Sequence, residues 1–365
     1  MQKSWSRITR GLLGLIVLGT VNPGLLACGV SPHSILQVEP KGKVKVKRGR
    51  DSWNAYSGLG LENNHRLVLP SGAKVTIYCS NAQIREVSSR GEHQVSSICS
   101  SAGSNHNNRC TISRNDEDPN TPYLISPRNT TIAESQPLLS WHPVEGATSY
   151  RVEISRVKWS TEVEETGVRY NGEKALQPGK RYTVKITAYE GEKDIAVSSA
   201  RFSILSEEEY QQLELAAKEL EEKFSQRQVL AFPLAKLYRK YKLYADAIDV
   251  LQWLTSEETQ GAEAYQLLGQ TYWDVGLLGL AKEQFSKALE VVEGEDNLGL
   301  KGSLQASLGI VTDRLATTQT DYQEATRLLE KALVAYRSLE ELTTDEKARV
   351  AEIEERLVEV KGKIE

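Results

Sequence analysis

The chain has 365 residues, of which 39% are hydrophobic and 26% are charged, and this length permits two or three domains. The composition is that of folded globular protein and excludes collagen-like and wholly disordered chains. The net charge of −4 hides an asymmetry, because residues 206–365 carry a net −12 and residues 1–205 carry a net +8.

Residues 1–28 have the pattern of an export signal. Three basic residues precede an apolar run at 11–21, and Leu25-Leu-Ala-Cys28 follows a break at 22–24. A basic segment, a short apolar run and a small residue before a cut are typical of secretory signals, and this run is shorter than the about 20 residues that span a bilayer. Residues 25–28 resemble a bacterial lipobox, which implies lipidation and membrane attachment at Cys28. Plain cleavage and an uncleaved anchor stay open, and all three place residues 30–365 outside the cytoplasm.

Three further cysteines follow Cys28. An exported chain meets an oxidising compartment, so a disulfide is expected. Cys79 and Cys99 each end a strand-like apolar run, which favours pairing between them, with Cys99–Cys110 as the alternative. The cysteines and nearby histidines lack the paired short spacings of a zinc site. We therefore expect no metal and no other cofactor.

Residues 35–100 predict a small antiparallel β domain. A basic run alternates with Gly42, Val44 and Val46, so a strand would show its lysines to solvent on one face. The run consists of Lys41, Lys43, Lys45, Lys47, Arg48 and Arg50. The pattern Gly42-x-Val-x-Val-x-Arg48, Leu67-x-Leu69, Gly72-Ala-x-Val-x-Ile77 resembles the FecR-like periplasmic domain, which implies a periplasmic sensing or binding module. Nucleic acid is not an expected partner of an exported chain. Residues 101–120 predict an exposed linker.

Residues 121–205 predict a second β domain. Trp141 is followed by Tyr150-x-Val-x-Ile154 and then by Leu176-x-Pro-Gly-x-x-Tyr182. This order resembles a fibronectin type III domain, which implies that Trp141 lies in the core and that the Tyr182 hydroxyl bonds back to the backbone. Such domains are spacers or binding modules. Trp159 lies outside the pattern and is either a packed surface aromatic or a binding anchor.

Helical spacing begins at residue 206, where Ser206 and Glu209 predict a capping box that opens a connecting helix over 206–227. Tyr265-x-x-Leu-Gly-x-x-Tyr272, Gly276 and Ala281-x-x-x-Phe-x-x-Ala288 then have the spacing of a tetratricopeptide repeat (TPR). A copy lies one 34-residue step earlier, and a third has a longer internal turn at 316–322. The sequence predicts three TPR-like repeats over 228–344 and a capping helix over 345–365. An ordinary helical bundle is the alternative.

Stacked TPR units predict a groove lined by the first helix of each pair. The repeat phase assigns to it Phe232, Lys236, Arg239, Lys240, Glu263, Gln266, Gln270, Trp273, Asp274, Ile310, Asp313 and Arg314. Aromatic and arginine side chains in such a groove suit a protein segment. Pro233 either starts or kinks the first repeat helix.

The predicted fold class is multidomain, with N-terminal all-β modules followed by an α-solenoid. The sequence holds no phosphate loop, nucleophile elbow, H-E-x-x-H or C-x-x-C motif, so the chain is not expected to be an enzyme. We predict an envelope-associated scaffold that binds a protein partner in the groove. The alternative is a sensor that recognises a polyanion or glycan through the basic first β domain, with the repeats as a spacer.

Overall fold

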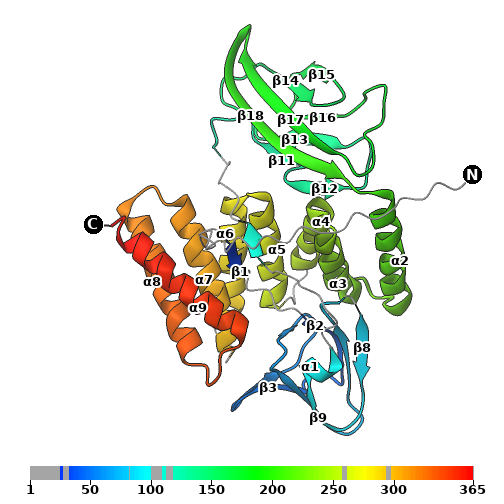
Figure 1. The fold of residues 1–365 in the computed structure, drawn as a ribbon, viewed down its shortest axis with the longest axis vertical. Helices are drawn as coiled ribbons and strands as arrows, with labels where there is room; N and C mark the ends of the chain where they lie inside the picture. The colour runs from blue at the N-terminus through cyan, green and yellow to red at the C-terminus, as the bar shows by residue number, and fades with distance from the viewer. Residues whose placement is uncertain are drawn as a thin grey trace, which may run out of the picture.

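The computed structural model describes residues 25–27, 33–81, 83–99, 109–111, 118–256, 261–292 and 297–364. For residues 25–27 and 109–111 it describes the backbone alone. Figure 1 shows a row of helices across the middle, with one β module on each side of the row. Cys28 and most of the predicted export signal lie outside the described residues, so lipidation stays a prediction.

The first β module (residues 33–99) consists of two four-stranded sheets. One sheet has the order β5-β2-β7-β8 and the other the order β4-β3-β6-β9. Their bounds are Gly60–Leu61, His33–Glu39, Lys74–Tyr78 and Ile84–Val87, then Asp51–Asn54, Lys45–Arg48, Arg66–Leu69 and Gly91–Gln94. Val46, Leu67, Val75 and Ile77 are fully buried between the sheets, as expected for strands that place alternate side chains on a core.

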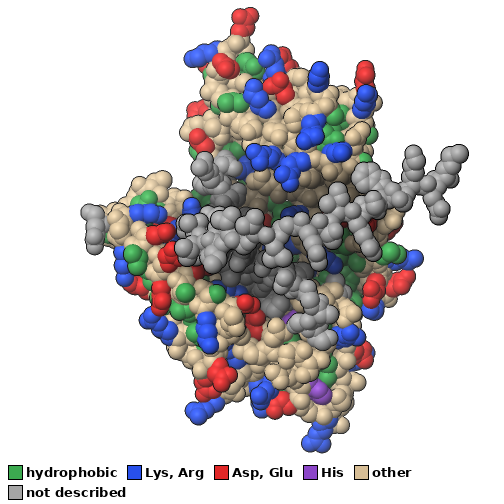
Figure 2. Space-filling view, in the orientation of Figure 1, with side chains coloured by type: hydrophobic (Ala, Val, Ile, Leu, Met, Phe, Trp, Pro, Cys, Tyr) green, Lys and Arg blue, Asp and Glu red, His purple; other side chains and the backbone are tan. Residues whose placement is uncertain are grey.

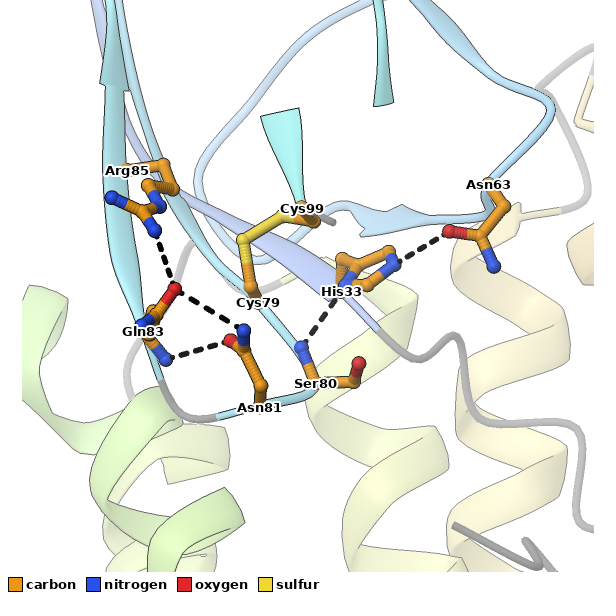
Figure 3. The surroundings of a disulfide bond; sticks show 8 residues. All are labelled: His33, Asn63, Cys79, Ser80, Asn81, Gln83, Arg85 and Cys99. Carbon is orange, nitrogen blue, oxygen red and sulfur yellow. Dashed lines mark hydrogen bonds between the residues drawn. A yellow bond between two sulfur atoms is a disulfide. The ribbon is translucent and has the colours of Figure 1, made fainter. Parts of the chain in front are cut away.

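The predicted disulfide joins Cys79 to Cys99 (Figure 3). The strand expected over 95–99 is wrong, because Val95–Ile98 forms the one-turn helix α1 and the Cys99 N–H donates to the Val95 carbonyl. His33 lies beside the two sulfurs. Its Nδ1 accepts from the Ser80 N–H at 3.0 Å, and its Nε2 contacts Asn63 Oδ1 at 3.0 Å. Because the nitrogens and both sulfurs are engaged, this cluster packs the module rather than offering ligands.

The second β module (residues 124–204) is a sandwich of a three-stranded and a five-stranded sheet. The sheet orders are β11-β13-β16 and β12-β18-β17-β14-β15. The bounds are Leu124–Ser126, Leu138–Trp141 and Gly167–Arg169, then Thr130–Ile132, Lys193–Ile204, Arg181–Glu190, Ser149–Ile154 and Trp159–Val163. Trp141 is buried in this core, as predicted. The Tyr182 hydroxyl accepts the Gln177 N–H at 2.9 Å, which is the predicted backbone contact.

Eight helices follow within the described residues from 207 to 361. They are α2 (Glu207–Lys223), α3 (Arg227–Lys240), α4 (Tyr244–Ser256), α5 (Ala262–Val275), α6 (Leu278–Val292), α7 (Leu298–Leu315), α8 (Gln319–Arg337) and α9 (Thr344–Lys361). Each packs mainly on its neighbours in the chain, which is the arrangement of a solenoid and not of a closed bundle. The capping box predicted at Ser206 and Glu209 opens α2.

Small residues bring the paired helices together, as the repeat phase predicts. A Cβ added to Gly269 of α5 would lie 2.9 Å from the Phe285 ring of α6. A Cβ added to Gly309 of α7 would lie 2.9 Å from Leu329 Cγ of α8. Neither position accommodates a Cβ unless its neighbours shift, so these glycines allow the two helices of a pair to pack closely.

Two details of the repeats differ from prediction. The long turn expected at 316–322 is wrong, because Thr318 and Asp321 form a capping box that begins α8 at Gln319. Pro233 lies inside α3, so it does not start that helix. None of the helices in the described part of the chain is both long enough and apolar enough to cross a membrane.

Candidate functional site: a helix face between two docked β modules

The first β module is joined to the solenoid by a buried ion pair. Arg48, at the end of β3, donates to both carboxylate oxygens of Glu346 in α9, at 2.7 and 2.6 Å. The Arg48 and Glu346 side chains are only 8% and 6% exposed. Arg48 also donates to the Glu341 carbonyl at 2.7 Å. A bidentate arginine–carboxylate contact of this kind fixes both the position and the orientation of the module relative to α9.

The N-terminal turn of α9 prepares Glu346 for this contact. Thr343 and Glu346 form a capping box, in which Glu346 Oε2 accepts the Thr343 N–H at 2.9 Å. Burial acts to raise the pKa of Glu346, but hydrogen bonds from Arg48 and Thr343 outweigh it and hold the pKa below its ordinary value. The carboxylate is therefore charged at neutral pH.

A second carboxylate, on α5, also contacts the first β module. Glu263, in the first turn of α5, accepts the Tyr56 hydroxyl at 3.0 Å and the Gly60 N–H at 3.2 Å. Glu263 is 5% exposed. The first β module thus rests on acidic side chains in the first turns of α5 and α9, where the helix dipole favours negative charge.

An apolar contact completes this joint. Leu36, Tyr78 and Ile84 of the first β module pack with Leu213 and Leu220 of α2 and with Leu237 of α3. Apart from the partly buried Ile84, these side chains belong to one buried cluster, separate from the core of the module itself. The contact anchors the edge formed by β2, β7 and β8, which lies next to α3 in Figure 1.

The second β module is joined to the helical turns on the other side of the row. The buried Arg128 donates from Nε to the Val275 carbonyl at 2.8 Å, beside the turn between α5 and α6. Thr130 Oγ1 donates to the Lys242 carbonyl at 2.9 Å, and the Thr131 N–H donates to the same carbonyl at 2.8 Å. This joint therefore uses main-chain carbonyls of the turns, whereas the first uses two carboxylates in addition to the Glu341 carbonyl.

The surface of α3, α5 and α7 that carries the predicted groove residues lies between these joints; we call it the inner helix face. Its polar side chains contact one another from helix to helix. Arg239 of α3 pairs with Asp274 of α5 at 2.9 Å. Gln266 Nε2 of α5 donates to Ser303 Oγ of α7 at 3.1 Å. At the far end, Lys363 Nζ donates to Asp313 Oδ1 of α7 at 2.6 Å.

Burial alters the proton affinity of two groups on this face. Burial, helped by the nearby Arg239, lowers the pKa of Lys236 to about 7, against the smaller opposing effects of Glu62 and Glu263. Burial raises the pKa of Asp274, and Arg239 opposes the rise. The inner helix face is thus poorly hydrated around Lys236 and Asp274, where Arg239 pairs with the Asp274 carboxylate.

The predicted groove residues are less open than expected. Lys240 and Arg314 are exposed, and Lys236, Arg239 and Asp274 are half-buried. The expectation of an open surface is wrong for seven residues: Phe232, Glu263, Gln266, Gln270, Trp273, Ile310 and Asp313. Phe232, Trp273 and Ile310 belong to the apolar core of the repeats, and Trp273 meets Phe285 edge to face at 6.1 Å. Helix α7 is buried throughout Gly302–Asp313, so the chain itself covers much of this face.

Extended backbone of the same chain lies against α5, which belongs to the inner helix face, and against α9. Leu25–Ala27 (β1) and Arg109–Thr111 (β10) form an antiparallel strand pair. Strand β1 contacts α9, and β10 contacts α5; both lie in front of the helices in Figure 1. The space between the two β modules therefore accommodates extended polypeptide.

Sequence reasoning missed the residues that join the modules. Arg48 belongs to the basic run at 41–50, but it lies an even number of residues from Val44 and Val46. Its side chain is therefore on the buried side of β3, opposite Lys45 and Lys47. Thr343-x-x-Glu346 is a capping-box pattern that could have been found. The pairing of Arg48 with Glu346 could not have been found from the sequence, because the two positions are 298 residues apart.

Comparison with known proteins finds only weak structural similarity. Neither a family model nor a curated protein matches the chain. Two solved structures of MamA are similar at 21% and 20% identity, with TM-scores of 0.28 and 0.29, over 41% and 42% of this chain and 85% and 84% of theirs. YrrB, described as a TPR protein with an unusual peptide-binding site, is similar at 12% identity and a TM-score of 0.27, over 42% of this chain and 81% of its own. Scores this low carry no argument about function.

Proposed function

We propose that the chain is a non-enzymatic interaction scaffold of a bacterial envelope. A TPR-type solenoid holds a FecR-like and a fibronectin type III-like module, and its inner helix face receives an extended segment of a protein partner. The observation that carries this proposal is the strand pair of β1 and β10 lying against α9 and α5. A face that accommodates extended chain from its own protein has the space and the polar groups to hold a partner's.

The side chains of the inner helix face suit that role. An extended segment presents main-chain N–H and carbonyl groups that need partners when they are buried. The face offers a carboxylate, an amide and a guanidinium group in Asp274, Gln270 and Arg239, which already contact one another. The exposed Lys240 and Arg314 lie on its first and last helices. A ligand that exchanges these internal contacts for its own binds without leaving a buried charge unpaired.

Export is part of the proposal and has a structural consequence. Cleavage ahead of Cys28 would remove Leu25–Ala27, which is the whole of β1. The mature chain would then lack the strand that contacts α9. Mass spectrometry of the mature N-terminus distinguishes a diacylglyceryl group on Cys28, a free cut end and an intact Met1.

Site-specific photo-crosslinking in an envelope fraction tests the partner face. A photoreactive residue at Lys240 or Arg314 samples the inner helix face, and one at Val334 of α8, which is 66% exposed, is the matched control on a second helix. We expect the first two positions to trap the same partner and Val334 to trap none of it. Equal trapping at all three positions, or none at Lys240 and Arg314, would overturn the proposal.

A further inference from the structure

The second β module contains a cavity that takes no part in joining it to the solenoid. The cavity has a volume of about 620 Å³, within the range of ligand pockets. Its walls are the turn between β14 and β15, the segment after β16 and the start of β17. Arg128 and Thr130, which contact the helices, are not among its lining residues.

Four cations line this cavity: Arg156, Lys158, Lys174 and Lys180. All four are exposed, and none joins an ion pair with another residue of the described chain. Glu173 is the one carboxylate of the lining. Elsewhere on the module cations do pair, as Arg151 does with Glu162 at 2.6 Å. Unpaired like charges around one cavity repel one another, and an anion bound there would relieve the repulsion.

An aromatic wall lies among the cations. Trp159 is half-buried and meets Tyr170 edge to face, with ring centroids 5.2 Å apart. Its Nε1 donates to Asn171 Oδ1 at 3.0 Å, which fixes the plane of the indole. The indole N–H is therefore already satisfied, and the ring contributes an apolar surface to the cavity.

Local backbone geometry holds these groups in place. Arg156 and Lys158 both have left-handed backbone, with φ of 70° and 52°, a conformation that costs non-glycine residues about 1–2 kcal/mol each. The Tyr170 hydroxyl donates to the Lys174 carbonyl at 2.6 Å. A Cβ on Gly172 would lie 2.2 Å from that hydroxyl, so only glycine lets this segment close around Tyr170 and bring Lys174 to the cavity.

We propose that this cavity binds an acidic oligosaccharide. The cations would pair with carboxylate, sulfate or phosphate groups of the sugar, and Trp159 would pack on the apolar face of a pyranose ring. Acidic sugars match both the cations and the aromatic ring, since each rigid ring carries an apolar C–H face and an anionic substituent. An acidic peptide has the charge without the flat C–H face. Figure 2 shows both basic and acidic side chains projecting from this module, so anion binding depends on the cations that line the cavity and not on the charge of the whole module.

Calorimetry with the full chain tests the proposal. The probe is an oligogalacturonate, compared with a neutral oligosaccharide of equal length, an oligothymidylate and a polyglutamate of matched charge. We expect the acidic sugar to bind and to weaken with salt, and the neutral sugar not to bind. Absence of oligogalacturonate binding, equal binding of the neutral sugar, or equal or tighter binding of the oligonucleotide or polyglutamate would each overturn the proposal.

Variants locate the site. The double substitution Lys158→Ala/Lys174→Ala should weaken oligogalacturonate binding about tenfold or more. Lys193→Ala/Lys347→Ala removes the same charge from exposed positions outside the cavity and should leave the affinity unchanged. Trp159→Phe should weaken binding while the thermal unfolding of the chain stays cooperative. Wild-type affinity in the Lys158/Lys174 variant, or an equal loss in the control, would contradict the assignment.

Discussion

The two β modules are joined to one solenoid by different chemistry. The first β module meets the first turns of α5 and α9 through side chains of opposite charge, Arg48 against Glu346, and through the Tyr56 hydroxyl on Glu263. The second gives its donors to main-chain carbonyls at Lys242 and Val275. A joint to a carboxylate depends on the protonation of that carboxylate, whereas a joint to a carbonyl does not. We therefore expect that lowering the pH weakens the joint of the first module and leaves the joint of the second unchanged.

The largest expected effect is at the ion pair of the first joint. Arg48→Ala leaves Glu346 buried without its cation, and breaking a buried pair costs about 3–5 kcal/mol. The free energy of unfolding, measured by urea titration of the full chain, should fall by that amount. Arg50→Ala is the matched control, because Arg50 contacts Glu340 at 3.1 Å with 92% of its side chain exposed, and exposed pairs contribute about 0–1 kcal/mol. Equal effects of the two substitutions would remove the distinction between the pairs.

The second joint gives the next largest effect. Arg128 is 3% exposed and donates to the Val275 and Leu124 carbonyls, at 2.8 and 3.1 Å. Arg128→Met keeps most of the volume but removes both hydrogen bonds. The Val275 carbonyl keeps the longer bond from Asn129 Nδ2, at 3.3 Å, so the expected cost is about 1–3 kcal/mol in total. The loss should be the same at pH 7 and pH 4. A strong pH dependence of the Arg128→Met effect would contradict the expected difference between the two joints.

Mild acid should weaken the first joint selectively. The pKa of Glu346 in the folded chain lies below its ordinary value of 4.5. A depressed carboxyl pKa contributes stability that is present above the unfolded value and is lost as the pH falls through the folded value. The stability difference between wild type and Glu346→Gln, followed by urea titration, should therefore shrink below about pH 4.5. A constant difference from pH 7 to pH 3 would show that the Glu346 charge does not act in the joint.

Replacing Lys236 should have a smaller effect, and it should raise the free energy of unfolding rather than lower it. Burial first, and then Arg239, lower its pKa from 10.5 to about 7. Between these two values the unfolded chain binds more protons than the folded chain, so stability rises as the pH rises from 7 toward 10.5. Lys236→Met should raise the free energy of unfolding at pH 6 by at least about 1 kcal/mol, the equivalent of one pKa unit. It should also flatten the rise between pH 7 and pH 9.

The smallest effect concerns the second β module alone. Tyr182→Phe removes the acceptor of the Gln177 N–H and should lower stability by about 1 kcal/mol. The loss should not change with pH, and thermal unfolding of the full chain measures it. A neutral substitution would show that water replaces the hydroxyl at this corner.

The sequence predicted local features better than contacts between modules. Gly269 and Phe285, Ser206 and Glu209, and Tyr182 each act through neighbours on the same element or the adjoining one, so spacing alone defines their roles. The pairing of Cys79 with Cys99 was also predicted, although the strand expected before Cys99 is a helical turn.

The inner helix face was harder to predict. The spacing of the repeats correctly places its residues on α3, α5 and α7. Spacing does not show which other parts of the chain cover these residues. Trp273 is 2% exposed because it packs on Phe285 and the repeat core. The cavity beside Trp159 was missed because its cations come from two separate loops of the second module, which no spacing rule connects.

A double-mutant cycle between Arg48 and Glu346 tests the central claim most directly, since the docked first module frames the inner helix face. Unfolding free energies of wild type, Arg48→Met, Glu346→Gln and the double variant give the coupling between two residues on opposite sides of the joint. The account predicts a coupling of about 2 kcal/mol or more at pH 7. A coupling near zero would mean that the first β module is not held on α9 by this pair.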